Sequence, residues 1–278
     1  MNDFTEIVRQ LSAFGAESPR LEARLLIAAA TNRIPSDIYS NTKLSPTEQQ
    51  KLQQMLDERL RHKPLDKILG HREFYKADFI VNTDVLSPRP DTEILVEKAL
   101  QYIPDTARTI LDLGTGSGCI IESILLEKPE ISGIAADKSV KSLEIAQKNA
   151  EKLGLCARIK FVAADWFEPD FTAKIGKKSD IIVTNPPYIP STDIVSLAPE
   201  VKNYDPMWAL DGGADGFDSY RRIAELTPDL LTDGGFILIE AGIGQAQAIA
   251  ELFVRQKLRL VEIASDLNRI PRCVILQK

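Results

Sequence analysis

Short apolar runs alternate with longer amphipathic segments along the chain from about residue 92 onward. The short runs are rich in Ile, Leu and Val and predict buried strands, whereas the longer segments repeat their apolar residues at helical spacing. This alternation is typical of an α/β fold with a doubly wound, mostly parallel sheet. The predicted strands are 109–114, 131–137, 158–165, 180–187, 234–242, 259–265 and 273–278, and the predicted helices are 92–103, 118–129, 141–154, 218–231 and 245–256.

Residues 1–75 have a different pattern, in which every segment looks helical. Ser18 and Pro19 suit the cap and the first position of one helix. Ser45 and Glu48 form a capping-box pair at the start of another, whose apolar residues recur at helical spacing. The sequence therefore predicts a small all-helical N-terminal domain.

A third pattern separates these two regions. The stretch VNTDVLSPRPDTE (81–93) is rich in Pro, Asp and Thr and predicts a connecting hairpin or loop. We therefore expect a helical domain at 1–75, a connection at 76–91 and the α/β domain at 92–278. A chain of 278 residues is long enough for one large domain and a small one.

Composition narrows the class of partner. With 44% hydrophobic and 27% charged residues, the chain is typical of a soluble globular protein. Its formal net charge of −6 argues against a broad nucleic-acid footprint. We therefore expect no stable complex with nucleic acid, and nothing in the sequence marks a self-association surface, so we expect a monomer.

The cysteine and histidine residues predict neither a metal site nor a disulfide framework. The three cysteines form no CxxC pair, and neither His62 nor His71 is near any of them in the sequence. Asp3 and Glu6 lie where a targeting peptide would avoid acidic residues, and the apolar run at 25–30 is too short to span a membrane. We expect a cytoplasmic protein with no metal and no membrane association.

The first predicted strand of the α/β region runs into the glycine-rich turn LDLGTGSGC, which includes Asp112 and the segment 114–118. Glycines between a strand and a helix allow backbone to approach a ligand at the positive end of the helix. Cys119 breaks the dinucleotide fingerprint, and no Gly-Lys-Ser or Gly-Lys-Thr marks a phosphate loop. The turn alone is equally compatible with a ligand cradle and with a tight structural turn.

Acidic residues end the next two predicted strands. Asp137 follows Gly116 by 21 residues, where an acid typically accepts the hydroxyls of a ribose, although it could instead cap the following helix. Asp165 and Trp166 could border an adenine, or be a strand-end acid and a core aromatic residue. The carboxyl ends of successive strands meet at one crevice. Together these residues predict an adenosine site that holds no pyrophosphate.

The fourth predicted strand ends in an elbow, Asn185-Pro186-Pro187-Tyr188. Two prolines fix two φ angles and remove two donors, so the elbow is rigid. The Asn185 side-chain oxygen and the Pro186 carbonyl can accept both N–H bonds of a planar NH2 group, and Tyr188 can stack on it. An adenosine ligand beside such acceptors suggests S-adenosylmethionine and a nitrogen acceptor, although the elbow could also be a plain strand terminator.

These motifs resemble those of a known superfamily. DLGTGSG, Asp137, ADWF and NPPY together resemble the class I S-adenosylmethionine-dependent methyltransferases that modify planar nitrogens. GHREFY (70–75), LSPRPDTEILVE (86–97) and NYDPMWALDGGADGFDSYRRI (203–223) are similar to the PrmC/HemK family, the N5-glutamine methyltransferases of peptide chain release factors.

The resemblance implies a seven-stranded class I sheet and methylation of the glutamine amide in the GGQ motif of class I release factors. It implies that Arg89 and the loop PRPDTE (88–93) lie beside the substrate entrance and that the helical domain grips the rest of the release factor. The implied donor contacts are Asp112, Gly114, Thr115, Gly116, Ser117, Gly118, Asp137, Asp165, Trp166 and Asn185, and the implied glutamine contacts are Asn185, Pro186, Pro187 and Tyr188.

The sequence departs from the family pattern at a few positions. Ser87, Asp205 and Trp208 differ from the usual family residues, and Glu240 has no assignable role. The loop PRPDTE favours release factors over the sibling family that methylates a ribosomal-protein glutamine. DGGADGFD (211–218) lacks calcium-loop spacing and predicts a turn before a helix.

Three further functions use some of the same motifs. An adenine-N6 methyltransferase of DNA or RNA would use NPPY in the same way, but it should carry a basic recognition surface. A binding module without turnover would keep the donor site, although the intact glycine-rich turn, Asp137 and NPPY argue against decay. A nicotinamide-dependent oxidoreductase is disfavoured by Cys119.

Overall fold

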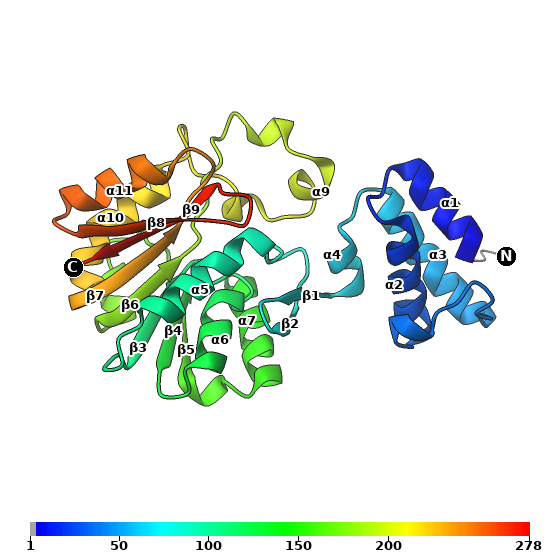
Figure 1. Ribbon diagram of the computed structural model, residues 1–278, viewed down its shortest axis with the longest axis horizontal. Helices are drawn as coiled ribbons and strands as arrows, with labels where there is room; N and C mark the ends of the chain where they lie inside the picture. Colours follow the sequence, from blue (N-terminus) through cyan, green and yellow to red (C-terminus); the bar gives the residue numbers. More distant parts are fainter. Residues whose placement is uncertain (1–3) are drawn as a thin grey trace. The chain divides into compact units, whose positions relative to one another are not determined.

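The computed structural model describes residues 4–278, which form two compact units (Figure 1). The first unit contains the residues up to Gly70 together with Ala198–Tyr204, and the second contains His71–Leu197 and Asp205–Lys278. Residues 1–3, including Asp3, lie outside the described residues. The segment 198–204 joins the first unit although it is far away in sequence, which the sequence pattern did not predict.

The first unit is helical, as predicted for most of its length. Its helices enclose one apolar cluster that includes Ile7, Leu26 and Leu56. The predicted capping box is confirmed, since the Ser45 side chain accepts from the Glu48 N–H and Glu48 accepts in return. Ser18 occupies the N-cap before Pro19 but makes no side-chain capping bond. The helices are α1 (Phe4–Phe14), α2 (Pro19–Thr31), α3 (Pro46–Leu60), α4 (Leu65–Leu69) and α9 (Pro199–Lys202).

A hairpin opens the second unit, and its position corrects the expectation that residues up to about 75 are helical. Strand β1 (His71–Phe74) pairs antiparallel with β2 (Ala77–Ile80), ahead of the stretch 81–93 where a hairpin or loop was expected. Gly70 ends α4 in the left-handed conformation, and Tyr75 has a φ of 56° in the turn. Phe74 and Phe79 are buried against each other, so strand alternation prevails over helical spacing here.

The main sheet has seven strands in the order β5-β4-β3-β6-β7-β9-β8, which confirms the predicted fold class. The pairs from β5 to β7 are parallel, and β9 is antiparallel to both of its neighbours. The strands are β3 (Thr109–Leu113), β4 (Ser132–Asp137), β5 (Ile159–Ala163), β6 (Ser179–Thr184), β7 (Leu231–Glu240), β8 (Arg259–Ser265) and β9 (Pro271–Gln277).

Helices cover both faces of this sheet, and strand alternation divides the core between them (Figure 1). Leu111 and Ile182 pack with α10 and α11, whereas Ile110 and Val183 pack with α5 and α6. The short helix α8, between β5 and β6, was not predicted. The helices are α5 (Glu93–Tyr102), α6 (Cys119–Glu127), α7 (Val140–Leu153), α8 (Phe171–Ile175), α10 (Asp218–Leu230) and α11 (Ala246–Arg255).

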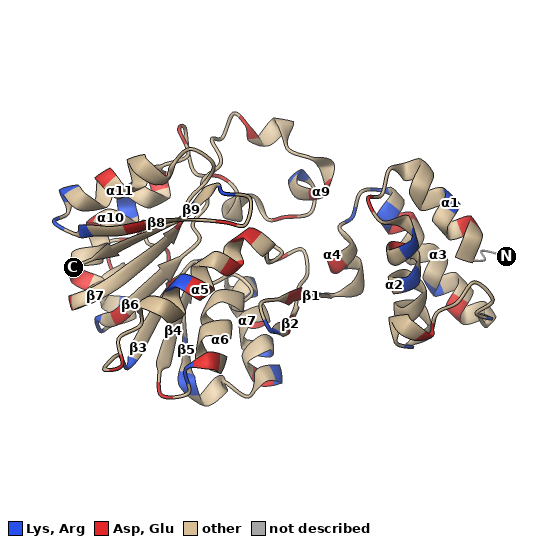
Figure 2. Cartoon of the chain, in the orientation of Figure 1, with Lys and Arg blue, Asp and Glu red and all other residues tan. Residues whose placement is uncertain are grey.

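Two further features concern the apolar character of the helices and the distribution of charge. Among residues 4–278, no helix combines the length and the apolar character that crossing a membrane requires. Lys and Arg are interspersed with Asp and Glu along the helices of the first unit (Figure 2).

Candidate active site

The candidate site lies where the order of the strands reverses. Strand β3 has β4 on one side and β6 on the other, so the chain winds outward from β3 in both directions. Leu113 is in register with Thr184, and the glycine-rich turn and Asn185 therefore emerge side by side. Ligands of open α/β sheets bind at this type of switch point.

The glycine-rich turn is shaped for close approach. Gly114 and Gly118 have φ angles of 76° and 83°, in the left-handed region. A Cβ on Gly114 would lie 3.3 Å from the Trp166 ring, and one on Gly118 would lie 2.2 Å from Oε1 of Glu122. Gly114, Thr115, Gly116 and Ser117 line a cavity, whereas Gly118 is not one of its lining residues.

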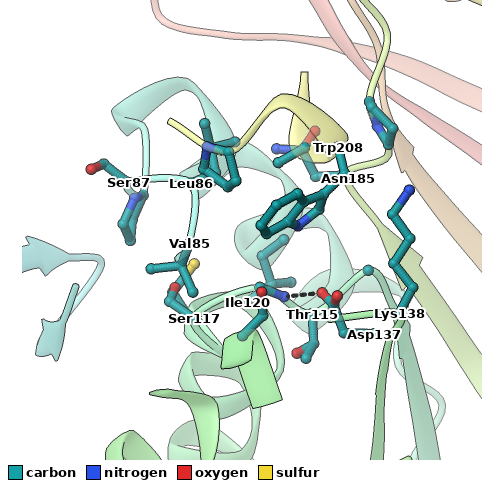
Figure 3. Close-up of a pocket in the computed structure, with 18 of the residues that line it drawn as sticks. Val85, Leu86, Ser87, Thr115, Ser117, Ile120, Asp137, Lys138, Asn185 and Trp208 are labelled. Carbon is teal, nitrogen blue, oxygen red and sulfur yellow. Dashed lines mark hydrogen bonds between the residues drawn. The ribbon is translucent and has the colours of Figure 1, made fainter. Parts of the chain in front are cut away.

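Asp137 lies on the floor of this cavity, across from Trp208 (Figure 3). Its Oδ2 accepts the Gly116 N–H at 2.9 Å, and its Oδ1 accepts the Ser139 N–H at 2.8 Å. Ser139 is the residue that caps α7, through the Ser142 N–H at 3.2 Å. The interpretation of Asp137 as a helix cap is therefore wrong. Burial raises the pKa of Asp137, although the two backbone N–H groups oppose this shift.

Asp165 and Trp166 also line the cavity. Asp165 Oδ1 accepts the Phe167 N–H at 3.0 Å, which holds the turn after β5. Trp166 is buried, belongs to a core cluster and packs on Gly114. Trp166 is thus both a core residue and a wall of the cavity, so the two interpretations offered by the sequence are compatible.

The elbow presents only part of itself to the cavity. Asn185 and Pro187 line it, whereas Pro186 is buried and is not one of its lining residues, and the half-buried Tyr188 packs against a core cluster. The Asn185 Nδ2 lies 3.4 Å from Oγ1 of Thr92 and donates to it. That donor faces the protein, so the orientation leaves the Asn185 oxygen as the group available to a ligand.

A second turn that contains glycines, at residues 211–218, packs behind the elbow. A Cβ on Gly212 would lie 2.8 Å from the Tyr188 Cα, and one on Gly216 would lie 2.4 Å from the Tyr188 carbonyl oxygen. The same carbonyl accepts from Nε2 of Gln245 at 3.1 Å. The stretch 211–218 is a turn before α10, as predicted, and residues 4–278 contain no cluster of potential metal ligands.

Two loops complete the cavity, and sequence reasoning missed most of their residues. The Arg89 guanidinium bridges them, with Nη2 2.9 Å from Oδ2 of Asp205, whose side chain is only 1% exposed. Their Pro and Asp content signalled loops but not a shared wall. The residues missed are Val85, Leu86 and Ser87 on one loop and Pro206 and Ala209 on the other, with Cys119, Ile120, Lys138 and Ser142 on helices and turns nearby. Pro88, Thr92 and Trp208, which also line the cavity, belong to the two loops that were expected to face the substrate.

Buried acids lie beneath the glycine-rich turn. Asp112 is fully buried and does not line the cavity; its Oδ2 accepts the Thr115 hydroxyl at 2.7 Å. Burial raises the pKa of Asp112 to about 7. Glu122 is also fully buried, and neither carboxyl oxygen has a hydrogen-bond partner among the described residues. Burial, and then the charge of Asp112, raise the pKa of Glu122 to about 10.

Comparisons with known proteins agree with this geometry. Residues 4–70 match the PrmC N-terminal domain, and residues 90–198 match the methyltransferase small domain. The release factor glutamine methyltransferase of Rhodospirillum rubrum is 40% identical over 271 residues, which cover 97% of this chain and 82% of that protein. This chain belongs to the release factor glutamine methyltransferase family. The family is one of S-adenosylmethionine-dependent methyltransferases, so the resemblance found in the sequence is confirmed.

A second member of the release factor glutamine methyltransferase family, from Geobacter sulfurreducens, is 39% identical, with 95% of this chain and 91% of that protein covered. Among solved structures, the hMettl16 catalytic domain in complex with a 3′UTR hairpin superposes with a TM-score of 0.55. It is 15% identical and covers 72% of this chain and 74% of that chain. This likeness supports the class I methyltransferase fold and nothing finer.

Proposed function

We propose that this protein transfers a methyl group from S-adenosylmethionine to the side-chain amide nitrogen of the glutamine in the GGQ motif of class I peptide chain release factors. One observation carries the proposal: a single cavity brings the glycine-rich turn and Asp137 together with the amide of Asn185. The names of the relatives supply the protein substrate. The cleft has a volume of about 790 Å³ when the open solvent at its mouth is included.

The donor fits one end of this cavity. Asp137 keeps a carboxylate there for the ribose hydroxyls, because only one of the two lone-pair directions on each oxygen is used by Gly116 and Ser139. Asp165 and Trp166 would border the adenine, and residues 114–117 would lie along the methionine part. Asp112 supports the turn from below through its hydrogen bond from the Thr115 hydroxyl, and Gly118 ends the turn at the start of α6. When bound, the donor supplies a methyl group on a sulfonium.

The acceptor fits the other end. An amide nitrogen is a weak nucleophile because its lone pair is delocalised into the carbonyl. The Asn185 oxygen and the Pro186 carbonyl would accept its two N–H bonds, orient it toward the methyl group and favour the positive charge that develops on it. The prolines hold these acceptors rigidly. Tyr188 would border the planar amide from its half-buried position.

The remaining assignments are part of the same proposal. Arg89 would lie beside the entrance for the glutamine, and the helical unit would grip the body of the release factor. No general base or metal is needed, because the nitrogen becomes acidic once it carries the methyl group. We propose that the protein acts in the cytoplasm as a monomer, without stable contact to nucleic acid or membrane.

The decisive test is methyl transfer from labelled S-adenosylmethionine to a purified class I release factor. The expected result is one methyl group on the glutamine of the GGQ motif, located by peptide mass spectrometry. A release factor with that glutamine replaced by alanine is the control and should incorporate nothing. Donor binding without transfer would reject the release-factor assignment and direct the search to ribosomal-protein and nucleic-acid substrates.

A further inference from the structure

Glu240 is the neighbour of Asn185 on the next strand. Thr184 of β6 is in register with Ile239 of β7, so Asn185 and Glu240 occupy adjacent positions at the carboxyl ends of two parallel strands. Ile239 packs on the α10 side of the sheet and Leu238 on the α5 side. Because strand side chains alternate, Glu240 points to the α5 side. Asn185 points to the same side, since Val183 does so two residues earlier.

Thr92 covers this pair at the start of α5. Its Oγ1 accepts from Nδ2 of Asn185 at 3.4 Å. The Thr92 hydroxyl and the Asn185 amide also lie close enough to the carboxyl group of Glu240 to oppose the rise that burial causes in its pKa. Glu240 is 3% exposed, and its Oε2 has no hydrogen-bond partner among the described residues. These three side chains form a buried network that ends in an acid with spare acceptor capacity.

The network decides which way the amide of Asn185 faces. A side-chain amide has an oxygen that accepts and an NH2 group that donates, and rotating it by half a turn exchanges the two. With Thr92 and Glu240 accepting on the protein side, the NH2 group is held there and the oxygen is left for the cavity. In the opposite orientation the oxygen would face Glu240, and a ligand NH2 group would meet another NH2 group.

We propose that Glu240 is a positioning residue that, through Thr92 and directly, holds the Asn185 amide with its oxygen toward the acceptor nitrogen of the substrate. This inference rests on the proposed function for the identity of that substrate. The orientation of Asn185 is a property of the free protein, so it can also be measured without any substrate. Glu240 touches no reacting atom and acts only through the side chain it holds.

The first experiment observes the side-chain amide of Asn185 by NMR in the donor-free protein labelled with ¹⁵N at asparagine. In the wild type, its two N–H protons should exchange slowly with water because both are hydrogen-bonded in a buried network. They should exchange faster in Glu240→Ala and at an intermediate rate in Glu240→Gln, whose oxygen still accepts but whose NH2 group also tolerates the flipped amide. Unchanged exchange in Glu240→Ala would overturn the inference, whatever the substrate proves to be.

The second experiment is a double-mutant cycle on methyl transfer. Glu240→Ala should lower kcat by about tenfold or more, with donor affinity close to wild type, because the acceptor amide loses one oriented hydrogen bond. Asn185→Ala combined with Glu240→Ala should be no slower than Asn185→Ala alone, since both changes remove the same interaction. Losses that multiply would show that Glu240 acts independently and would overturn the proposal.

Folding is monitored by thermal melts of each variant, and Glu240→Gln serves as the isosteric variant if the alanine change destabilises the protein. A Glu240→Gln enzyme that is fully active and keeps slow Asn185 exchange would show that the acid is not required to hold the amide, which overturns the role given to it. A wild type that methylates no release factor would reject the proposed function alone, since the NMR comparison still tests Glu240.

Discussion

Polar side chains have different surroundings at the two ends of the parallel strands. We call the amino-terminal ends of these strands the amino edge of the sheet and the carboxyl-terminal ends the carboxyl edge. At the amino edge, Asp180 accepts from the N–H groups of Arg108 and Thr109 at 2.8 and 3.0 Å and from the Thr109 and Thr232 hydroxyls at 3.1 and 3.3 Å. At the carboxyl edge, Glu240 retains a buried oxygen with no partner among the described residues. The electrostatic result is opposite: hydrogen bonds lower the pKa of Asp180 despite partial burial, whereas burial raises that of Glu240 to about 7.

Arg158, also at the amino edge, has its polar groups hydrogen-bonded in the same way as Asp180. Its guanidinium donates to the carbonyl oxygens of Leu125, Lys128 and Ile131, where α6 ends and β4 is about to begin. Helix ends leave carbonyls without partners, so this side chain satisfies groups that would otherwise need water. Polar groups at the amino edge are therefore hydrogen-bonded and stabilise the fold. The carboxyl edge instead contains buried acids that can still accept hydrogen bonds and can thereby orient groups of the site.

The largest expected effect concerns Glu122, below the glycine-rich turn. In the unfolded chain this acid ionises near its ordinary pKa of 4.5, but in the folded protein it stays neutral up to a pKa of about 10. A raised acid pKa destabilises the fold progressively as pH rises above the lower value, and at pH 7 the cost is about 3 kcal/mol. Glu122→Gln should therefore raise the free energy of unfolding by up to this amount at pH 7 and change it little at pH 4.

Urea unfolding at the two pH values measures this difference. The matched control is Glu144→Gln, which changes an exposed carboxyl group on the neighbouring helix α7 and should give no pH-dependent gain. An equal gain at pH 4 and pH 7 would mean that Glu122 does not carry a neutral acid, and the contrast between the edges would then lose its clearest case.

Asn185→Ala probes the group that the carboxyl edge keeps for the substrate. Removing the acceptor oxygen should cost about 1–3 kcal/mol of transition-state stabilisation, or about tenfold to a few hundredfold in kcat, with the donor affinity nearly unchanged. Single-turnover methyl transfer measures the rate, and calorimetry measures donor binding. Asn268→Ala, at an exposed position in the β8–β9 turn, is the control and should keep the wild-type rate. A normal rate for Asn185→Ala would refute the role given to the elbow.

Asp180→Ala is the corresponding change at the amino edge. It removes the acceptor by which the start of β6 holds the starts of β3 and β7. Because water can reach part of this site, a loss of about 1–2 kcal/mol in unfolding free energy is expected. Asp180→Asn retains one acceptor oxygen and should lose about half as much. The methyl-transfer rate below the melting range should be unaffected. A lowered rate in a fully folded Asp180 variant would blur the distinction between the two edges.

The sequence predicted the site better where local pattern decides and less well where distant packing decides. The alternation of short strands and helices predicted the sheet, and the turn 114–118 and the elbow at Asn185 were placed correctly at strand ends because those motifs carry their own backbone geometry. Thr92 is 93 residues from Asn185, and no local pattern joins them. The function of Glu240 depends on β7 pairing with β6, which only the folded sheet establishes.

The cavity wall illustrates the same limit. Arg89 and the loop PRPDTE (88–93) were expected beside the substrate entrance because of the family resemblance, but the ion pair of Arg89 with Asp205 requires two loops that tertiary packing brings together. The hairpin at 71–80 was missed because its two four-residue strands are too short for a clear alternation. Side-chain contacts between segments that are far apart in the sequence therefore could not be predicted.

The smallest expected effect is on product binding, and it concerns Trp208 at the surface of the carboxyl edge. The chain has two tryptophans, Trp166 and Trp208, and both line the cavity. Trp208 is 39% exposed, so bound donor product should cover it and change its fluorescence. Trp208→Ala should weaken product binding by about threefold to tenfold, as expected for one lost aromatic contact of about 0.5–1.5 kcal/mol, whereas Trp208→Phe should retain most of the affinity. Phe167→Ala, which removes an exposed aromatic ring that does not line the cavity, is the control. If Trp208→Ala binds the product like the wild type and keeps the fluorescence change, the change comes from Trp166, and the donor contacts only the buried Trp166 side of the cavity. If both the product affinity and the fluorescence change fall, the loop at 206–209 closes the donor site from the opposite side.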